Sequence, residues 1–290
     1  SAALGLPRAW GSYEEMLADP DVDAVYNPLP NHLHVPLSIQ AAAAGKHVLC
    51  EKPIGLSAAE AQDLIHARNR YGVKIGEAFM ARTHPQWLRA QELVVSGAIG
   101  ELRAILGFFS YNNRDPKNIR NIAEWGGGAL MDIGCYPVTL SRMLFDAEPV
   151  AISAFVERDA AFGTDKISSA ILQYSQGHCV FTASTQMVPY QRMHLIGTKA
   201  RIEIEIPFNA PIDRPCRLFL DDGSSPMGKG IRIEEIPTAD QYTIQGELFS
   251  RAILEDGEVP VSLEDAWANM RCIEAIFKSA KLGKTITLPA

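Results

Sequence analysis

Lys52 is the first residue whose type and position suggest chemistry. It follows the short apolar run "HVLC" in the string "HVLCEKPI", and this run predicts a buried parallel strand that ends near Glu51. Open α/β sheets bind their ligands at the carboxyl edge of such strands, so we expect Lys52 at a binding site. Its ammonium group could hydrogen-bond a hydroxyl or carbonyl oxygen and lower the pKa of a neighbouring group. The alternative is a solvated lysine in a loop.

Asp132 and Tyr136 form a second candidate set, in the string "EWGGGALMDIGCYPVTLSRM". They are four residues apart, so a helix here would present both on one face. The three glycines before them permit a tight turn against a closely bound ligand. Brought to Lys52, the pair could transfer a proton: the phenol of Tyr136 would exchange it, and Asp132 would orient the substrate hydroxyl or the lysine. An exposed aspartate and a half-buried tyrosine without a chemical role are the alternative.

Other motifs argue against several further kinds of chemistry. His32 and His34 have the spacing of a metal-binding pair, but no carboxylate or cysteine completes a set nearby. We therefore expect no metal, and favour cofactor contacts or a helix cap for these histidines. The string "GSSPMGKG" at 223–230 is similar to a phosphate loop, yet it lacks the Ser or Thr and precedes a strand, so we expect a hairpin turn. The sequence holds no GxSxG elbow and no CxxC pair.

The composition of the 290 residues is that of a soluble globular protein. Hydrophobic residues make up 47% and charged residues 21%, which excludes a disordered, collagenous or coiled-coil protein. The 27 basic and 34 acidic residues give a net charge of −7 without any basic run, so we expect no nucleic-acid partner. No apolar run is long enough to predict a membrane span. Five cysteines, odd in number and widely spaced, favour reduced thiols and a cytoplasmic location.

The elements that must position these residues alternate along the first part of the chain. Ser57 and Glu60 form a capping box that predicts the start of one helix. We expect, in order, a helix at 12–17, a strand at 22–27, a helix at 34–45, a strand at 46–51, a helix at 57–71 and a strand at 73–79. This alternation predicts a parallel, doubly wound sheet with right-handed crossovers.

The pattern changes after about residue 84. We expect helices at 85–96, 129–144 and 263–282, and strands at 101–112 and 285–289. Between residues 150 and 236 strand-like runs follow one another, separated by turn residues, which predicts a largely antiparallel sheet. The predicted fold class is therefore α/β. A partial Rossmann domain spans residues 1–82, and an α+β domain with a large, open, mostly antiparallel sheet spans residues 83–290.

One part of a dinucleotide-binding domain is missing from the predicted elements. Such a site needs a first strand, a glycine-rich turn and a helix N-terminus to hold the pyrophosphate. The sequence contains no GxGxxG string, and its three strands correspond to the nicotinamide-side half of the sheet. We therefore expect residues 1–82 to be the remnant of a Rossmann domain. Two explanations stand side by side: the first βαβ unit lies upstream of Ser1, or the protein has lost its pyrophosphate site.

Taken together, these strings resemble the glucose–fructose oxidoreductase, inositol dehydrogenase and rhizopine-catabolism protein family (Gfo/Idh/MocA). The resemblance covers nearly the whole chain and is strongest in "DAVYNPLPNHLHVPLSIQAAAAGKHVLCEKPI", "GEAFMARTHPQW", "NIRNIAEWGGGALMDIGCYPV" and "SLEDAWANMRCIEAIFKSAKLGK". It implies NAD or NADP as the cofactor, and homodimers or homotetramers that pair through the open sheet. Tyr136 stands where inositol dehydrogenases have histidine, which points to the branch of glucose–fructose oxidoreductase, xylose dehydrogenase and dimeric dihydrodiol dehydrogenase.

The resemblance also implies roles for individual residues. The catalytic residues would be Lys52, Asp132 and Tyr136. The substrate would be bound by the same three residues and by Arg120. The cofactor-binding residues would be Pro28, Asn31, His34, Glu51, Lys52, Pro53, Arg82 and Trp125.

These observations predict an NAD(P)-dependent oxidoreductase that transfers hydride between nicotinamide and a hydroxyl or carbonyl group of a sugar or related cyclic polyol. Two alternatives stand beside it: a non-catalytic protein of the same fold that senses a dinucleotide or sugar, and an inactive fragment. A pure sensor has no need of Lys52, Asp132 and Tyr136 together, and their presence favours the enzyme.

Overall fold

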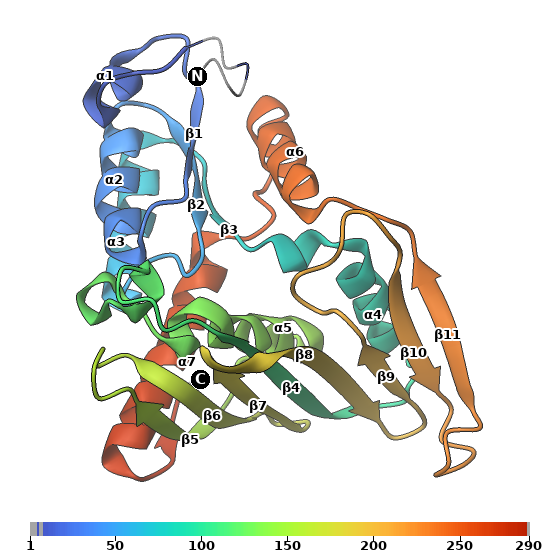
Figure 1. The fold of residues 1–290 in the computed structure, drawn as a ribbon. Coiled ribbons are helices and arrows are strands. Elements are labelled where there is room, and N and C mark those ends of the chain that lie inside the picture. The colour runs from blue at the N-terminus through green and yellow to red at the C-terminus, as the bar shows by residue number, and fades with distance from the viewer. Residues whose placement is uncertain (1–4, 6–7, 289–290) are drawn as a thin grey trace.

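A parallel sheet forms the first unit of the computed structural model, which describes residue 5 and residues 8–288 (Figure 1). After the short helix α1 (Tyr13–Ala18), the strands β1 (Ala24–Asn27), β2 (His47–Glu51) and β3 (Ile75–Ala78) lie in this order, and both pairings are parallel. Helices α2 (Asn31–Ala43) and α3 (Ala58–Tyr71) connect the strands and lie together on one side of them. The predicted strand–helix alternation is confirmed.

Helix α3 shows how the local sequence sets an element boundary. The Ser57 hydroxyl accepts a hydrogen bond from the Glu60 backbone N–H at 3.1 Å. The Glu60 carboxylate in turn accepts one from the Leu56 N–H at 2.7 Å, so the predicted capping box is present, shifted by one residue on its return bond. Ala61 and Leu64 then turn a fully buried face toward the core. The helix therefore holds the loop after β2 firmly in place.

The second unit is built on a broad sheet that contains nine strands within residues 102–287. The pairings are antiparallel except that of β4 with β7, which is parallel. In spatial order the strands are β11 (Ile231–Ile236), β10 (Cys216–Asp221), β9 (Arg201–Ile204), β8 (Gln186–Gly197), β4 (Leu102–Asn112), β7 (His178–Ser184), β6 (Asp165–Gln173), β5 (Ala151–Arg158) and β12 (Ile286–Thr287). The predicted open, mostly antiparallel sheet is confirmed. The connection between β10 and β11 contains 223–230, as expected for a hairpin, and Pro289 of the last predicted strand lies outside the described residues.

Helices α4 (Pro85–Val95), α5 (Cys135–Phe145) and α7 (Leu263–Leu282) cover one face of this sheet (Figure 1). The helix predicted at 129–144 is divided, because a π-helical turn, η5 (Leu130–Gly134), precedes α5. Pro137 lies just after this junction and has no N–H to donate to the carbonyl of Ile133, so an uninterrupted α-helical bonding pattern is not available there. The wider turn contains Asp132.

Helix α6 (Gln241–Leu254) was not predicted from the sequence. The Asp240 carboxylate caps it by accepting hydrogen bonds from the N–H groups of Tyr242 and Thr243 at 3.0 and 3.4 Å. Its Phe249 packs against Leu49 of β2 and Ala78 of β3. This helix therefore returns the chain from the large sheet to the parallel sheet.

The two units are joined by more than the chain crossing near residue 82. Helix α7 packs against both α3 and β5, and Arg68 of α3 forms a salt bridge with Glu264 of α7 at 2.7 Å. The backbone N–H of Glu77 in β3 also donates to the carbonyl of Val261, before α7. Within residues 8–288, the model contains no helix with the length and apolar character that crossing a membrane requires.

Candidate active site

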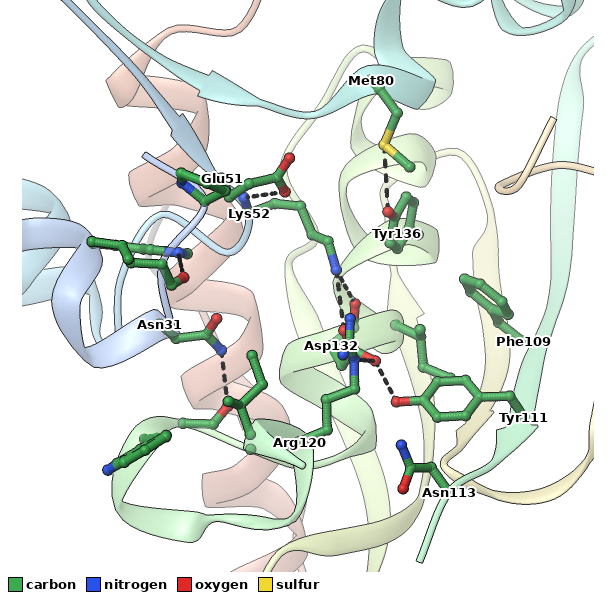
Figure 2. A pocket seen from close by; sticks show the side chains of 18 of the residues that line it. Asn31, Glu51, Lys52, Met80, Phe109, Tyr111, Asn113, Arg120, Asp132 and Tyr136 are labelled. Carbon is green, nitrogen blue, oxygen red and sulfur yellow. Dashed lines mark hydrogen bonds and ion pairs between the residues drawn. The ribbon is translucent and has the colours of Figure 1, made fainter. Parts of the chain in front are cut away.

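A cavity of about 490 Å³ opens between the carboxyl edge of the parallel sheet and the η5–α5 segment of the second unit. Its volume is in the range of small-molecule sites. Among the residues that line it are these predicted ones: Pro28, Asn31, His34, Glu51, Lys52, Arg120, Trp125, Asp132 and Tyr136. Residues separated by as much as 108 positions in the sequence are therefore brought together (Figure 2).

Lys52 extends from the end of β2 toward Asp132 (Figure 2). Its Nζ donates to the Asp132 backbone carbonyl at 2.5 Å and lies 3.4 Å from Oδ1 of the same residue. The same nitrogen is 4.9 Å from the centre of the Tyr136 ring. Burial disfavours the charged lysine, but the negative charge that Tyr136 and Asp132 can carry outweighs it, and the pKa of Lys52 rises well above its usual value. The site therefore contains a fixed ammonium ion.

Asp132 is held by three side chains from three elements. Its Oδ2 accepts hydrogen bonds from the Tyr111 hydroxyl of β4 at 2.5 Å and from Arg120 Nε at 2.8 Å, while Oδ1 faces Lys52 (Figure 2). Burial opposes ionisation of Asp132, but Lys52, Arg120 and these hydrogen bonds outweigh it, and the pKa of Asp132 is lowered. Asp132 is thus an oriented carboxylate at neutral pH.

The phenol of Tyr136 lies in an aromatic surround. Phe79, Phe109 and Phe208 place their rings 4.9 to 5.7 Å from that of Tyr136, and its hydroxyl donates to Met80 Sδ at 3.4 Å. Burial raises the pKa of Tyr136, and Lys52 opposes that rise. A thioether sulfur is a weak acceptor, so the protonated phenol keeps a proton that a bound oxygen atom could receive.

The loops that follow β1 and β2 form the opposite wall. The ring nitrogens of His34 lie 2.8 Å from the Pro53 carbonyl oxygen and 2.6 Å from that of Leu29, which ties the two loops together. Asn31 Nδ2 donates to the Gly126 carbonyl at 2.9 Å and so connects this wall to the glycine turn. Across residues 8–288, no three His, Cys, Asp or Glu side chains are grouped as a metal site requires.

Two predicted residues lie outside the cavity lining. The Arg82 guanidinium points toward the second unit, where it pairs with Asp265 of α7 at 2.8 Å and with the Thr139 hydroxyl of α5 at 3.0 Å. Pro53 is buried in the turn after Lys52 and contributes its carbonyl oxygen to His34. Arg82 and Pro53 therefore contribute to the site by supporting the walls of the cavity. This geometry does not support a direct cofactor contact for either residue.

Several lining residues were not identified from the sequence. Tyr111 is the most important, because it contacts Asp132 directly. Phe109 and Tyr111 are two residues apart in a predicted strand, which favours one face for both, and this was the available signal. Asn113, which follows the strand, also lines the cavity. Tyr26 of β1, whose hydroxyl donates to the Glu51 carboxylate, and Tyr242 of α6 also line the cavity. Their approach depends on contacts between distant elements.

The chain is similar to known oxidoreductases in sequence and in fold. Residues 1–79 match a family model described as an oxidoreductase family with an NAD-binding Rossmann fold, and residues 87–203 match the GFO/IDH/MocA C-terminal domain. An uncharacterized oxidoreductase of Rhizobium meliloti is 45% identical over 286 residues, which cover 98% of this chain and 86% of that protein. D-xylose 1-dehydrogenase (NADP(+)) 2 of Haloferax volcanii is 37% identical over 289 residues, with 98% and 86% covered. The crystal structure of an aldose-aldose oxidoreductase from Caulobacter crescentus has a TM-score of 0.87 and 31% identity, covering 95% of this chain and 82% of that one.

Proposed function

The chain belongs to the Gfo/Idh/MocA family of NAD(P)-binding oxidoreductases, and on that premise we propose that Lys52, Asp132 and Tyr136 interconvert a hydroxyl and a carbonyl group on a sugar or similar cyclic polyol. The observation that carries this proposal is the convergence of an ammonium, an oriented carboxylate and a protonated phenol in one cavity. A protein that only senses a ligand has no need for this combination.

The cofactor fits the wall formed by the loops after β1 and β2, where Pro28, Asn31, His34 and Glu51 line the cavity at the carboxyl edge of the parallel sheet. Among the hydrogen bonds of the described residues, none uses Asn31 Oδ1, which leaves an acceptor for a carboxamide N–H. A bound NAD(P) supplies hydride in the reducing direction and accepts it in the oxidising direction.

The protein's own groups handle the proton. In reduction, the Tyr136 hydroxyl donates its proton to the substrate's carbonyl oxygen, so that the C=O bond becomes C–OH once hydride has reached the carbon. The phenolate left behind is stabilised by the ammonium of Lys52, and it recovers a proton from solvent. In oxidation the phenolate accepts the hydroxyl proton. Asp132 keeps Lys52 charged and in place throughout.

The charge of the cavity supports an uncharged substrate. Its charged lining residues are Glu51, Lys52, Arg120 and Asp132, two of each sign. Asp132 pairs with both Lys52 and Arg120, and Glu51 supplies the second negative charge, so the four charges sum to zero and leave no strong net field for a phosphate or carboxylate group. Polar side chains that remain available, such as Asn113 and Asn209, suit the hydroxyl groups of a polyol.

Removal of the proposed proton-transfer groups tests this function. Turnover of aldoses with NADP or NAD is measured for wild type, Lys52→Ala and Tyr136→Phe, and each variant should lose about 100-fold or more in kcat. Lys74→Ala and Tyr71→Phe, which change residues outside the cavity, should retain wild-type kcat. Equal kcat in wild type and in both site variants would exclude these roles. A wild-type chain that binds NADPH or NADH in a fluorescence titration but turns over no aldose would favour the sensor.

The outer face of the large sheet supports self-association. Ile171 of β6, Val180 of β7 and Leu106 of β4 are directly paired across neighbouring strands and are all exposed. The neighbouring residues along these strands, Ile105, Cys179 and Leu172, are fully buried, so the exposed row lies on the face away from the helices that Figure 1 shows on the sheet. A second copy could cover the row there. We infer a dimer or a tetramer that pairs through this face.

All five cysteines lie in the described part of the chain as buried free thiols, which favours a reducing, cytoplasmic location.

A further inference from the structure

Glu77 is a buried carboxyl group outside the active-site cavity. It belongs to β3 beside Cys50 of β2, and only 3% of the residue is exposed. Its Oε1 accepts a hydrogen bond from the backbone N–H of Ile54 at 2.8 Å. Its Oε2 has no hydrogen-bond partner among the residues that the structure describes. Oε1 therefore holds a backbone N–H in place, whereas the environment of Oε2 has no such explanation.

The Glu77 side chain lies on the face of the parallel sheet that points away from α6. Strand alternation places Leu49, Gly76 and Ala78 on the face that packs against Phe249 of α6, so Cys50 and Glu77 point to the opposite, buried face. An ionised carboxylate with an unpartnered oxygen in such a place is costly, whereas a protonated acid carries no net charge.

The charges around Glu77 do not compensate an ionised carboxylate. The neighbouring ionisable groups are Cys50 of β2, Arg82, Cys135 and Arg142 of α5, and Asp265 of α7. Both arginines form salt bridges with Asp265, and Glu77 has no ion pair within the described residues. Burial, with a smaller contribution from Asp265, raises the pKa of Glu77 to about 8, although the Ile54 N–H and the two arginines oppose the rise.

The hydrogen bond to Ile54 connects this buried group to the active site. Ile54 follows Lys52 by two residues, in the turn where the chain leaves β2. The direction of the Lys52 side chain depends on the backbone of that turn, and a displacement of about 1 Å at a catalytic group lowers rates by about 100-fold. A group that fixes the Ile54 N–H therefore affects how Lys52 meets Asp132 and Tyr136.

We propose that Glu77 is held as a neutral carboxylic acid and that its bond to Ile54 positions the turn that presents Lys52. Glu77 is thus a positioning residue for the reaction, and this last part of the proposal rests on the proposed function of Lys52.

Replacement by the neutral isostere separates positioning from simple packing. Glu77→Gln is uncharged and keeps an oxygen for the Ile54 N–H, so kcat should stay within about twofold of wild type. Glu77→Ala removes this acceptor, and kcat should fall by about 10-fold to 100-fold. Asp221→Asn is the matched control: it changes a buried carboxylate of β10 that pairs with Arg201 at 2.9 Å, and it should lower the melting temperature without changing kcat. Equal kcat for Glu77→Ala and wild type, or equal losses in Glu77→Ala and Glu77→Gln, would overturn the positioning role.

The protonation state has readouts that need no turnover, so they remain valid if the proposed function fails. An infrared difference spectrum of wild type and Glu77→Gln at pH 7 should contain the carbonyl band of a protonated acid; carboxylate bands alone would contradict the proposal. The folded state keeps a proton that the unfolded chain releases near the ordinary glutamate pKa, so wild-type stability should fall as pH rises from about 4.5 to about 8. The melting temperature of Glu77→Gln relative to wild type should rise over this window and level off above it.

Discussion

At the scale of single residues, the chemistry of this site depends on how Asp132 is held. Its two carboxylate oxygens are directed to different partners, with Lys52 on one side and Tyr111 with Arg120 on the other. The carboxylate therefore fixes the position of the Lys52 ammonium group. The position of the carboxylate is in turn fixed by Tyr111 of β4, a strand that carries none of the proposed proton-transfer residues. Tyr111 is accordingly the residue whose loss should disturb the site while leaving each proposed reacting group present.

Tyr111→Phe should lower kcat by about 10-fold with a smaller change in KM. A hydrogen bond to a charged group contributes about 1.5–3 kcal/mol. Without it Asp132 would be held less firmly, so Lys52 would also be less well positioned and kcat would fall. The Tyr111 hydrogen bond also lowers the pKa of Asp132, so its removal should move the acidic limb of the kcat/KM profile to higher pH. Tyr190→Phe, an exposed residue on β8 outside the cavity, is the control. An unmoved acidic limb together with unchanged kcat would show that Asp132 does not need this support.

At the scale of elements, two glycine-to-alanine changes should have opposite effects. Gly128 precedes η5 with a φ of +121°, and an added Cβ would lie 1.9 Å from Asp165 Oδ1. Asp165 accepts a hydrogen bond from the Leu130 N–H at 2.7 Å, so Gly128→Ala should both destabilise the fold by about 2 kcal/mol or more and displace the start of the segment that carries Asp132. kcat should fall with it.

Gly246 offers the matched change in the middle of α6. No atom of the described chain lies within 4 Å of an added Cβ beyond its own helix and neighbours, and its φ is not positive. Gly246→Ala should therefore stabilise the protein by about 0.5–1 kcal/mol and leave kcat unchanged. Thermal melting of both variants checks the pair. A destabilised Gly246→Ala would mean that α6 is not continuous at this point.

These elements also show how far a single sequence predicts the molecule. The amphipathic helix predicted at 263–282 has the observed bounds of α7, and the structure shows that Ser262 caps its start and Gly283 ends it. Helix α6 was missed because Thr243, Ile244 and Gly246 weaken its local helix propensity, and its stability comes from the contact of Phe249 with a distant sheet. The same contrast holds for the candidate site. Local spacing in the sequence was enough to find Lys52 and the pair Asp132 and Tyr136. It did not reveal Tyr111 or Glu77, whose roles arise from contacts between separate elements.

At the scale of the whole molecule, the candidate site lies where the two units meet. The parallel sheet provides Lys52 and the proposed cofactor wall, while the second unit provides Asp132, Tyr136 and the polar end of the cavity. Helix α7 fixes these halves relative to each other, because Asp265 pairs with Arg82 of one side and Arg142 of the other, at 2.8 and 3.1 Å. The face of the large sheet that is covered by helices therefore forms the site. The opposite, outer face is left for other contacts.

The proposed pairing of two chains should depend on that outer face. A charge introduced at Val180 would be buried against a second copy, and an isologous interface would bury it twice. Val180→Glu should therefore raise the dimer dissociation constant by about 100-fold or more, read by sedimentation velocity across a concentration series. Val95→Glu, the same change at an exposed position at the end of α4, should leave association unchanged. Because the cavity is on the opposite face of the sheet, the dissociated variant should also keep its NADPH affinity. If wild type is a monomer, or if Val180→Glu associates as tightly as Val95→Glu, then this face does not pair the chains.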